Sequence, residues 1–202
     1  MRISDRYGFV FLANTQCASS AVRKALDPYS DYAPGTKASV DAGLELFDHW
    51  PASKMDVLLA PLGKRLSDYF SFTTVRNPWD RIVSRYHYGL KNPKSKWRAK
   101  VEQAGSFKAF ACDASLHWAT TFDVYAMEGD RMLVDAVARV EALQDDLEPI
   151  AQRLGLPPLT LARVNENPRG GARDYRTYYD DESAQAVADQ FAKDIALFGY
   201  RF

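Results

Sequence analysis

The segment Phe70–Tyr88, FSFTTVRNPWDRIVSRYHY, contains the pattern that decides the fold. Its first part, Phe70–Val75, is rich in aromatic and β-branched residues and predicts a buried strand. Asn77 and Pro78 then predict a helix start, because Asn caps helices well and Pro suits the first helical position. Asp80 adds a carboxylate to the first turn, where the helix dipole favours negative charge. The segment therefore predicts a strand, a short turn and a helix.

A second segment of the same kind lies nearer the start of the chain. Gly8–Ala13, GFVFLA, is a nearly continuous apolar run, which is typical of a strand buried on both faces. After a polar turn we expect a helix capped by Ser19 or Ser20. Its buried face should carry Val22, Ala25 and Leu26. Two strand–turn–helix units indicate a parallel sheet covered by helices.

Apolar residues spaced by three or four predict two further helices. One would extend from Val134 to Leu154 and end at Gly155, and the other would run from about Glu182 to Phe198, with Gly199 as its C-cap. No repeat, low-complexity tract or linker divides the chain. We therefore predict a single α/β domain over residues 1–202, a three-layer α/β/α fold around a central parallel sheet.

Composition limits the possible partners. Lys and Arg number 26 and Asp and Glu number 26, so the global basic field of a non-specific nucleic-acid binder is missing. Two cysteines and three histidines, without ligand spacing, do not form a disulfide framework or a metal site. The N-terminal apolar run is too short for a signal peptide or a membrane span. We expect a cytoplasmic protein that binds no nucleic acid, no membrane and no metal.

An anion site is expected where the predicted parallel strands end. Free N–H groups at the start of a helix favour negative charge, and the turn over residues 14–20 leads into such a start. The chain has no GxxxxGK[ST] motif, so a standard ATP or GTP loop is unsupported. Arg76 ends the second strand, and Ser84 follows on the next helix. Arg76 has two interpretations from the residues alone: it binds an anion, or it pairs with a carboxylate.

The central motif resembles a known family. Thr73–Tyr88 is similar to the 3′-phosphate-binding segment of sulfotransferases that use 3′-phosphoadenosine 5′-phosphosulfate (PAPS), in their carbohydrate-type and bacterial branch. Phe11–Val22 resembles that family's phosphosulfate loop, and Val137–Leu147 resembles its R-x-E-x-L-x-x-D helix. Asn165, Asp174–Glu182 and the ending DIALFGYRF are similar to its closing segments. The resemblance spans nearly the whole chain and is poorest in the first loop.

The resemblance implies a P-loop-like α/β fold and transfer of a sulfuryl group from PAPS to a hydroxyl-bearing acceptor, with a carbohydrate as one candidate, without a metal. His49 is the implied general base, because a histidine titrates near neutral pH. Gln16 would contribute only a hydrogen bond to catalysis. Arg173 belongs to a basic, glycine-containing loop implied to lie near the 3′-phosphate. The residues expected to bind PAPS are Thr15, Cys17, Ala18, Ser19, Ser20, Arg76, Ser84 and Arg173.

Gln16 departs from the family pattern and leaves alternatives open. The family has a lysine there, which offers positive charge to the leaving phosphate, and a neutral amide supplies less stabilisation. Catalysis could be slow, Arg23 or Lys24 could substitute, or the protein could bind PAPS or its desulfated product without turnover. A nucleotide kinase of similar architecture is a further alternative, against which the missing GK[ST] counts. A purely structural protein would leave the anion loop without a ligand.

Overall fold

The computed structural model describes residues 1–116, 121–162 and 174–202. Their contacts divide them into two compact units. The first lies within Met1–Val75 and Phe122–Val164, and the second lies within Arg76–Thr121 and Asn165–Phe202. Each unit is described by itself, and the expectation of one domain stays a prediction.

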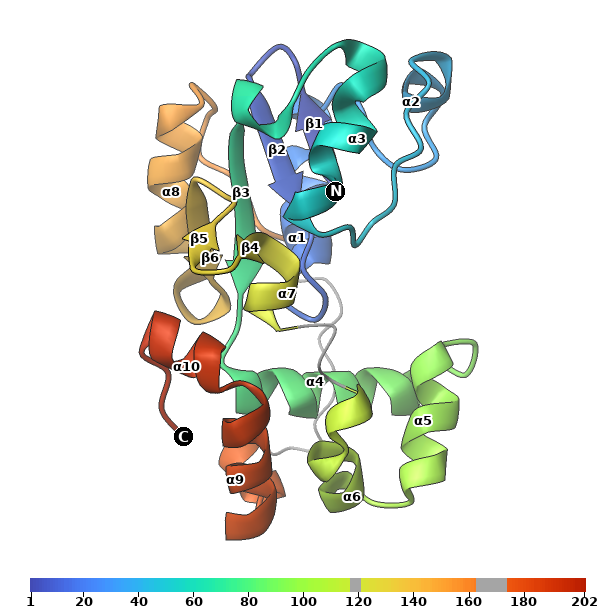
Figure 1. The fold of residues 1–202 in the computed structure, drawn as a ribbon, viewed down its shortest axis with the longest axis vertical. Helices are drawn as coiled ribbons and strands as arrows, with labels where there is room; N and C mark the ends of the chain where they lie inside the picture. The colour runs from blue at the N-terminus through green and yellow to red at the C-terminus, as the bar shows by residue number, and fades with distance from the viewer. Residues whose placement is uncertain (117–120, 163–173) are drawn as a thin grey trace. The chain divides into compact units, whose positions relative to one another are not determined.

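A four-stranded sheet forms the centre of the first unit (Figure 1). Its order is β1-β2-β3-β6, in which β2, β3 and β6 are parallel and β1 pairs antiparallel with β2. The parallel centre confirms the α/β fold class, whereas the antiparallel edge strand was not expected. The strands are β1 (Arg2–Ser4), β2 (Phe9–Leu12), β3 (Phe70–Val75) and β6 (Ala136–Arg139). A separate hairpin pairs β4 (Met127–Glu128) with β5 (Arg131–Met132).

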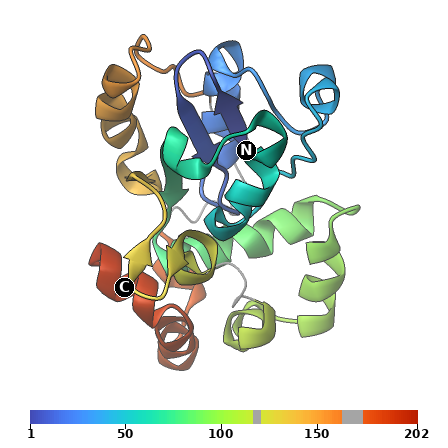
Figure 2. The same cartoon turned by 45° about the horizontal axis from the view of Figure 1, so that its top comes forward.

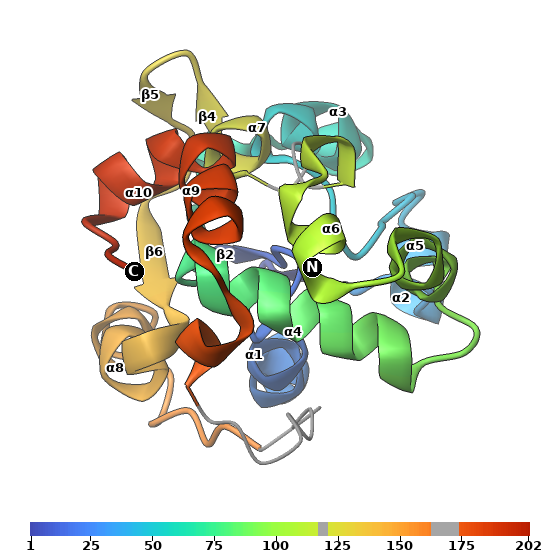
Figure 3. The ribbon, with the colours of Figure 1, turned by 90° about the horizontal axis from the view of Figure 1, so that it is seen from below.

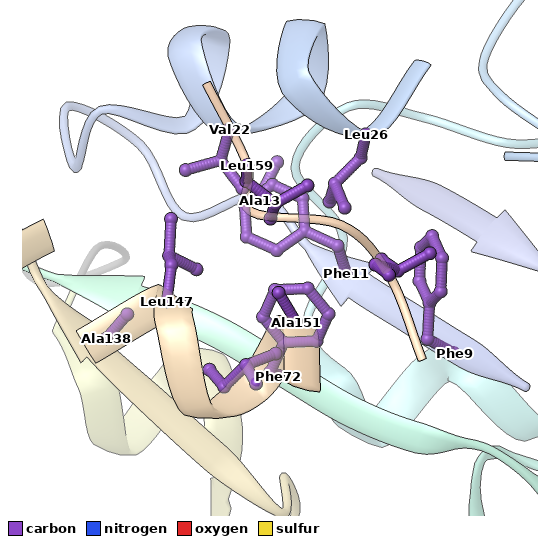
Figure 4. Close-up of a cluster of buried hydrophobic side chains, with 12 residues drawn as sticks. Phe9, Phe11, Ala13, Val22, Leu26, Phe72, Ala138, Leu147, Ala151 and Leu159 are labelled. Atoms are coloured by element: carbon purple, nitrogen blue, oxygen red, sulfur yellow. The ribbon is translucent and has the colours of Figure 1, made fainter. Parts of the chain in front are cut away.

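The core of the first unit lies against one face of this sheet. Figure 4 shows phenylalanine rings of β2 and β3 meeting side chains of α1 (Ser19–Leu26) and α8 (Leu143–Arg153). The rings of Phe11 and Phe72, which are register partners, have centroids 5.2 Å apart. Val10 and Leu12, which alternate with the phenylalanines on β2, are also fully buried, so both faces of the sheet are covered. Figure 3 shows β2 between α1 on one side and α3 (Met55–Leu59) on the other.

Two sequence predictions for the first unit need correction. The helix predicted from Val134 to Leu154 is a strand, β6, followed by a 3₁₀ turn and then α8. Pairing with β3 accounts for the difference, because the backbone of Ala136–Arg139 hydrogen-bonds to a neighbouring strand and not to itself. The cap of α1 is Ala18 and not Ser19 or Ser20, and it makes no side-chain cap bond. The predicted end at Gly155 is confirmed by its positive φ of 66°.

The remaining elements of the first unit are short connections. They are 3₁₀ helices η1 (Asp27–Tyr29), η2 (Ala52–Lys54), η3 (Ala60–Leu62), η4 (Leu66–Asp68) and η7 (Val140–Ala142), and helices α2 (Lys37–Asp41) and α7 (Phe122–Ala126).

The second unit is helical in its described residues. Asn77 caps α4 (Pro78–Lys91) as predicted, because its side chain accepts hydrogen bonds from the N–H groups of Trp79 and Asp80. Figures 1 and 2 show α5 (Lys96–Ala104) beside the C-terminal end of α4. The other elements are α6 (Phe107–Cys112), η5 (Ala114–Leu116), η8 (Tyr175–Tyr178), α9 (Asp181–Gln190) and α10 (Ala192–Phe198).

The predicted last helix is in fact two helices. Phe191 leaves the helical region with φ −115° and ψ 24°, which separates α9 from α10. The residue at this break is 1% exposed and lies in an apolar cluster with Val187 and Trp79, so the chain changes direction at a buried side chain. The predicted glycine C-cap is confirmed, because Gly199 ends α10 with a positive φ of 66°.

Candidate active site

The turn between β2 and α1 has an unusual backbone. Gln16 and Ala18 have positive φ values of 58° and 54°, and they are the non-glycine residues with positive φ in the described chain. A left-handed residue that is not glycine is disfavoured by roughly 1–2 kcal/mol, and such strain gathers at functional sites. Left-handed residues in a turn also allow successive N–H groups to converge on an anion. The loop over residues 14–20, which we call the anion loop, therefore has the backbone of an anion-binding turn.

Hydrogen bonds inside the unit hold the anion loop in this shape. The buried Ser19 hydroxyl donates to the Asn14 carbonyl, which closes the loop on itself. From the neighbouring strand, the Thr74 hydroxyl donates to the Cys17 carbonyl over 2.6 Å. The Asn14 side-chain amide returns a bond to the Thr74 carbonyl over 3.3 Å. The hydroxyl of Ser19 is thus engaged within the loop, whereas Ser20 is half-buried at its helical end.

His49 lies at the start of this loop. Its Nδ1 is 2.6 Å from the carbonyl oxygen of Ala13, the residue that follows β2. A carbonyl only accepts, so Nδ1 carries the hydrogen and the neutral ring keeps its lone pair on Nε2. Desolvation lowers the pKa of His49 below its ordinary value, against the raising effects of the Ala13 bond and of Asp48. The ring is therefore neutral at pH 7 and has a basic nitrogen on the side away from Ala13.

Arg23 connects the segment before His49 to the anion loop. Its Nη1 forms an ion pair with the Asp48 carboxylate, and its Nη2 donates to the Ser20 hydroxyl over 3.3 Å. Burial raises the pKa of Asp48, but the hydrogen bond and charge of Arg23 bring it below its ordinary value. Asp48 and His49 thus attach the same segment to the loop at two points. Sequence reasoning named Arg23 as a possible cation but missed Asp48.

An aromatic pair flanks the candidate base. The rings of Phe47 and Trp50 stack with centroids 5.4 Å apart and planes 17° from parallel. Phe47 is 53% exposed, although burial is the usual state of a phenylalanine. His49 lies between Phe47 and Trp50 in the sequence, so the candidate base is next to an apolar ring surface in the chain.

Arg76 and Ser84 belong to the second unit. Arg76 Nε is 2.6 Å from a carboxylate oxygen of Asp80, and both side chains are largely buried. The carboxylate interpretation of Arg76 is thus correct for Nε, and the pair fixes how the guanidinium is oriented. Asp80 and Ser84 are four residues apart in α4, so they share one face of that helix. Ser84 is 7% exposed.

The same helix carries features that the sequence did not reveal. Arg81 and Arg85 are 2% and 0% exposed, although arginine is rarely buried. The Arg85 guanidinium lies over the Trp97 ring at 4.6 Å, and the Lys100 ammonium lies 4.9 Å from it. These contacts place Trp97 in the packing of the second unit. Arginine in an amphipathic pattern reads as a surface residue, so no sequence signal would have found this burial.

Several predicted positions lie outside the described residues. They are Arg173, with the rest of its basic loop, and Asn165. Within the described ranges, no group of three metal-ligating side chains could hold an ion, and no helix is long and apolar enough to cross a membrane.

A family model described as "Sulfotransferase family" matches residues 2–201. The chain belongs to the sulfotransferase family. Its fold is similar to that of mouse sulfotransferase SULT7A1, crystallised with PAP, at a TM-score of 0.51 and 15% identity, over 96% of this chain and 86% of that one. A sulfotransferase from Alicyclobacillus acidocaldarius aligns at a TM-score of 0.44 and 16% identity, over 96% of both chains.

A sequence relative comes from Archaeoglobus fulgidus. This uncharacterized protein is 30% identical over 107 residues, which cover 52% of this chain and 83% of the relative. The family and the fold of this sulfotransferase confirm the resemblance found in its sequence. Neither tests the residues assigned to the site, which stay predictions.

Proposed function

We propose that this sulfotransferase transfers the sulfuryl group of PAPS to the hydroxyl group of an acceptor. The observation that carries the proposal is the anion loop with its left-handed residues Gln16 and Ala18, to which His49 is bonded through Ala13. Such a loop suits a phosphosulfate, and a neutral histidine beside it suits the removal of a hydroxyl proton. The PAP complex of the mouse relative supports adenosine 3′,5′-bisphosphate (PAP) as the product side of the reaction.

The reaction needs one bond to form and one to break. The acceptor oxygen bonds to sulfur while its proton passes to Nε2 of His49. The bond between sulfur and the bridging phosphate oxygen breaks, and its electron pair leaves with PAP. Donors fixed before the reaction stabilise charge most effectively, so the residues assigned to the phosphosulfate are those of the anion loop. These are Thr15, Gln16, Cys17, Ala18, Ser19 and Ser20.

Arg76 and Ser84 are assigned to the 3′-phosphate. The assignment rests on the resemblance of their segment to the family motif and on the chemistry of the two groups. A guanidinium presents several donors in a rigid fork, which matches a phosphate, and a serine hydroxyl adds a further donor. Asp80 stabilises the orientation of that fork through Arg76 Nε.

Phe47 and Trp50 point to the class of acceptor. Phe47 is exposed and Trp50 is half-buried, and aromatic rings that reach solvent bind flat, partly apolar surfaces such as the face of a sugar or a phenol ring. A hydroxyl compound with such a face would gain contact area beside His49. The proposal therefore favours a ring-bearing acceptor, a carbohydrate or a phenol, over a linear alcohol. A cytoplasmic location stays a prediction.

Calorimetric titration with PAP tests the nucleotide assignment. We expect PAP to bind, AMP to bind more weakly, and Arg76→Ala to weaken PAP by at least about tenfold, as loss of a charge-assisted bond of 1.5–3 kcal/mol implies. Arg98→Ala is the matched control, because Arg98 also pairs with a carboxylate four residues later at 2.6 Å. Equal affinity for PAP and AMP, or equal effects of the two variants, would contradict the assignment.

A binding protein without turnover is the second candidate. The observation that favours it is that no residue of the anion loop, including Gln16, carries a charge. Gln16→Lys separates the two functions. A rise in PAPS turnover identifies an enzyme with a weakened loop, and absence of turnover from both forms, with PAP still bound, identifies a binding protein.

A further inference from the structure

We propose that Arg23, acting through Ser20, is the positioning residue that stabilises the negative charge of the leaving phosphate. The inference rests on the proposed function and names the group that supplies positive charge to a loop whose own side chains are neutral. Every side chain from Asn14 to Ser20 is uncharged. Arg23 is the first cation after them, and it is hydrogen-bonded to the last of them, Ser20.

The direction of the Ser20 bond defines how Arg23 acts. Guanidinium groups only donate, so the Ser20 oxygen accepts from Arg23 Nη2. The hydroxyl hydrogen of Ser20 then remains available for another acceptor, and the cation behind it makes that hydrogen a better donor. An anion in the loop is the acceptor that this arrangement suits. As the sulfur–oxygen bond breaks, charge grows on the phosphate oxygen, and the Ser20 hydrogen bond becomes stronger.

Burial and geometry keep Arg23 in this position. Its side chain is 19% exposed, against 44% for that of its partner Asp48, so water screens the carboxylate more than the cation. Asp48 contacts Nη1 and Ser20 contacts Nη2, so the carboxylate holds the guanidinium without occupying the nitrogen that faces Ser20. The Nε atom is buried and has no hydrogen-bond partner among the described residues. Lys24, by contrast, is exposed.

Two measurements on the whole protein test the proposal: calorimetric affinity for PAP, and release of PAP from PAPS with 4-nitrophenol or N-acetylglucosamine as the acceptor probe. Arg23→Gln should lower kcat at least about tenfold while the PAP Kd changes by no more than about twofold, because loss of a charge-stabilising donor affects the transition state most. Lys24→Gln is the matched control and should retain the wild-type values. Arg23→Lys, which keeps the charge, should recover part of the loss.

A double variant separates charge from structure. Gln16→Lys should restore kcat in the Arg23→Gln background more than it raises kcat in the wild type, because one cation then replaces the other. A purely structural Arg23 would give no such rescue. Its loss would lower the melting temperature, PAP affinity and kcat together.

The outcomes distinguish this inference from the proposed function. If the wild type does not bind PAP, the proposed function fails and the inference with it. If the wild type binds PAP but releases none from PAPS, or if Arg23→Gln is as active as the wild type, the role of Arg23 is overturned while PAP binding stands. A parallel loss of binding and stability also overturns it.

Discussion

Replacing Ala18 by glycine should stabilise the protein, although glycine inside a helix usually destabilises it. Ala18 caps α1 with φ 54° and ψ 15°, a left-handed conformation. For an L-residue this conformation costs roughly 1–2 kcal/mol, which glycine avoids. Glycine loses more backbone entropy on folding, which costs roughly 0.5–1 kcal/mol. The difference predicts a gain of about 0.5–1 kcal/mol in the free energy of unfolding.

Urea denaturation followed by circular dichroism measures this gain. The midpoint should rise with an unchanged slope, and the melting temperature should rise by about 1–4 °C for a chain of this size. Ala25→Gly is the matched control, because Ala25 lies inside α1 and packs against the core. There glycine should cost about 1 kcal/mol. If Ala18→Gly destabilised the protein as much as Ala25→Gly does, strain in the anion loop would be refuted.

Four further predictions concern the base, in activity and in stability, the aromatic pair and the packing of α4. Desolvation lowers the pKa of His49, so kcat/KM should keep its value down to pH about 6.5 and fall only below that pH. His49→Gln should remove both the activity and this decrease at acid pH. A decrease that begins above pH 7 would contradict the assignment of His49 as the base. The same shift means that the unfolded chain takes up this proton at a higher pH than the folded chain, so the contribution of His49 to stability should decline on acidification below pH about 6.5, and His49→Gln should flatten that part of the stability profile. Phe47→Ala and Trp50→Ala should raise the KM for 4-nitrophenol or N-acetylglucosamine with little change in kcat, and an equal effect on a linear alcohol would exclude ring recognition. Gly89→Ala should destabilise the protein by about 1–3 kcal/mol in thermal denaturation. The Cβ of the new alanine would lie 2.8 Å from Val101 Cγ2 and 2.9 Å from the Trp97 carbonyl oxygen. A gain in stability, as helix propensity alone predicts, would show that α5 moves away freely.

Local sequence patterns were sufficient to predict the elements that are determined by residues within or next to them. The strand Phe70–Val75 has the bounds read from its β-branched and aromatic residues. The capping of α4 by Asn77 was also predictable, because capping depends on adjacent residues. The helix prediction for Val134–Arg139 was wrong because valines spaced by three also occur in strands. Only the distant partner β3 decides between the two structures.

The candidate site shows the same division. The position of the anion loop followed from the order of strand and helix, and His49 from a family resemblance. The contact between His49 and Ala13, and the ion pair between Arg23 and Asp48, join residues that are distant in the sequence. No spacing rule encodes such contacts. The left-handed backbone of Gln16 and Ala18 was equally hidden, because glycine and asparagine are the usual signals for it.

The hydroxyl groups of Thr73 and Thr74 have a consequence for protein engineering. They bond to the carbonyls of Leu12 and Cys17, which lie on either side of the first part of the anion loop. The conformation of the loop thus depends partly on a strand more than fifty residues away in the sequence. Grafting residues 14–20 alone into another α/β scaffold would transfer the sequence of the loop but not its conformation. A transplant that keeps the loop's shape has to carry both threonines with it.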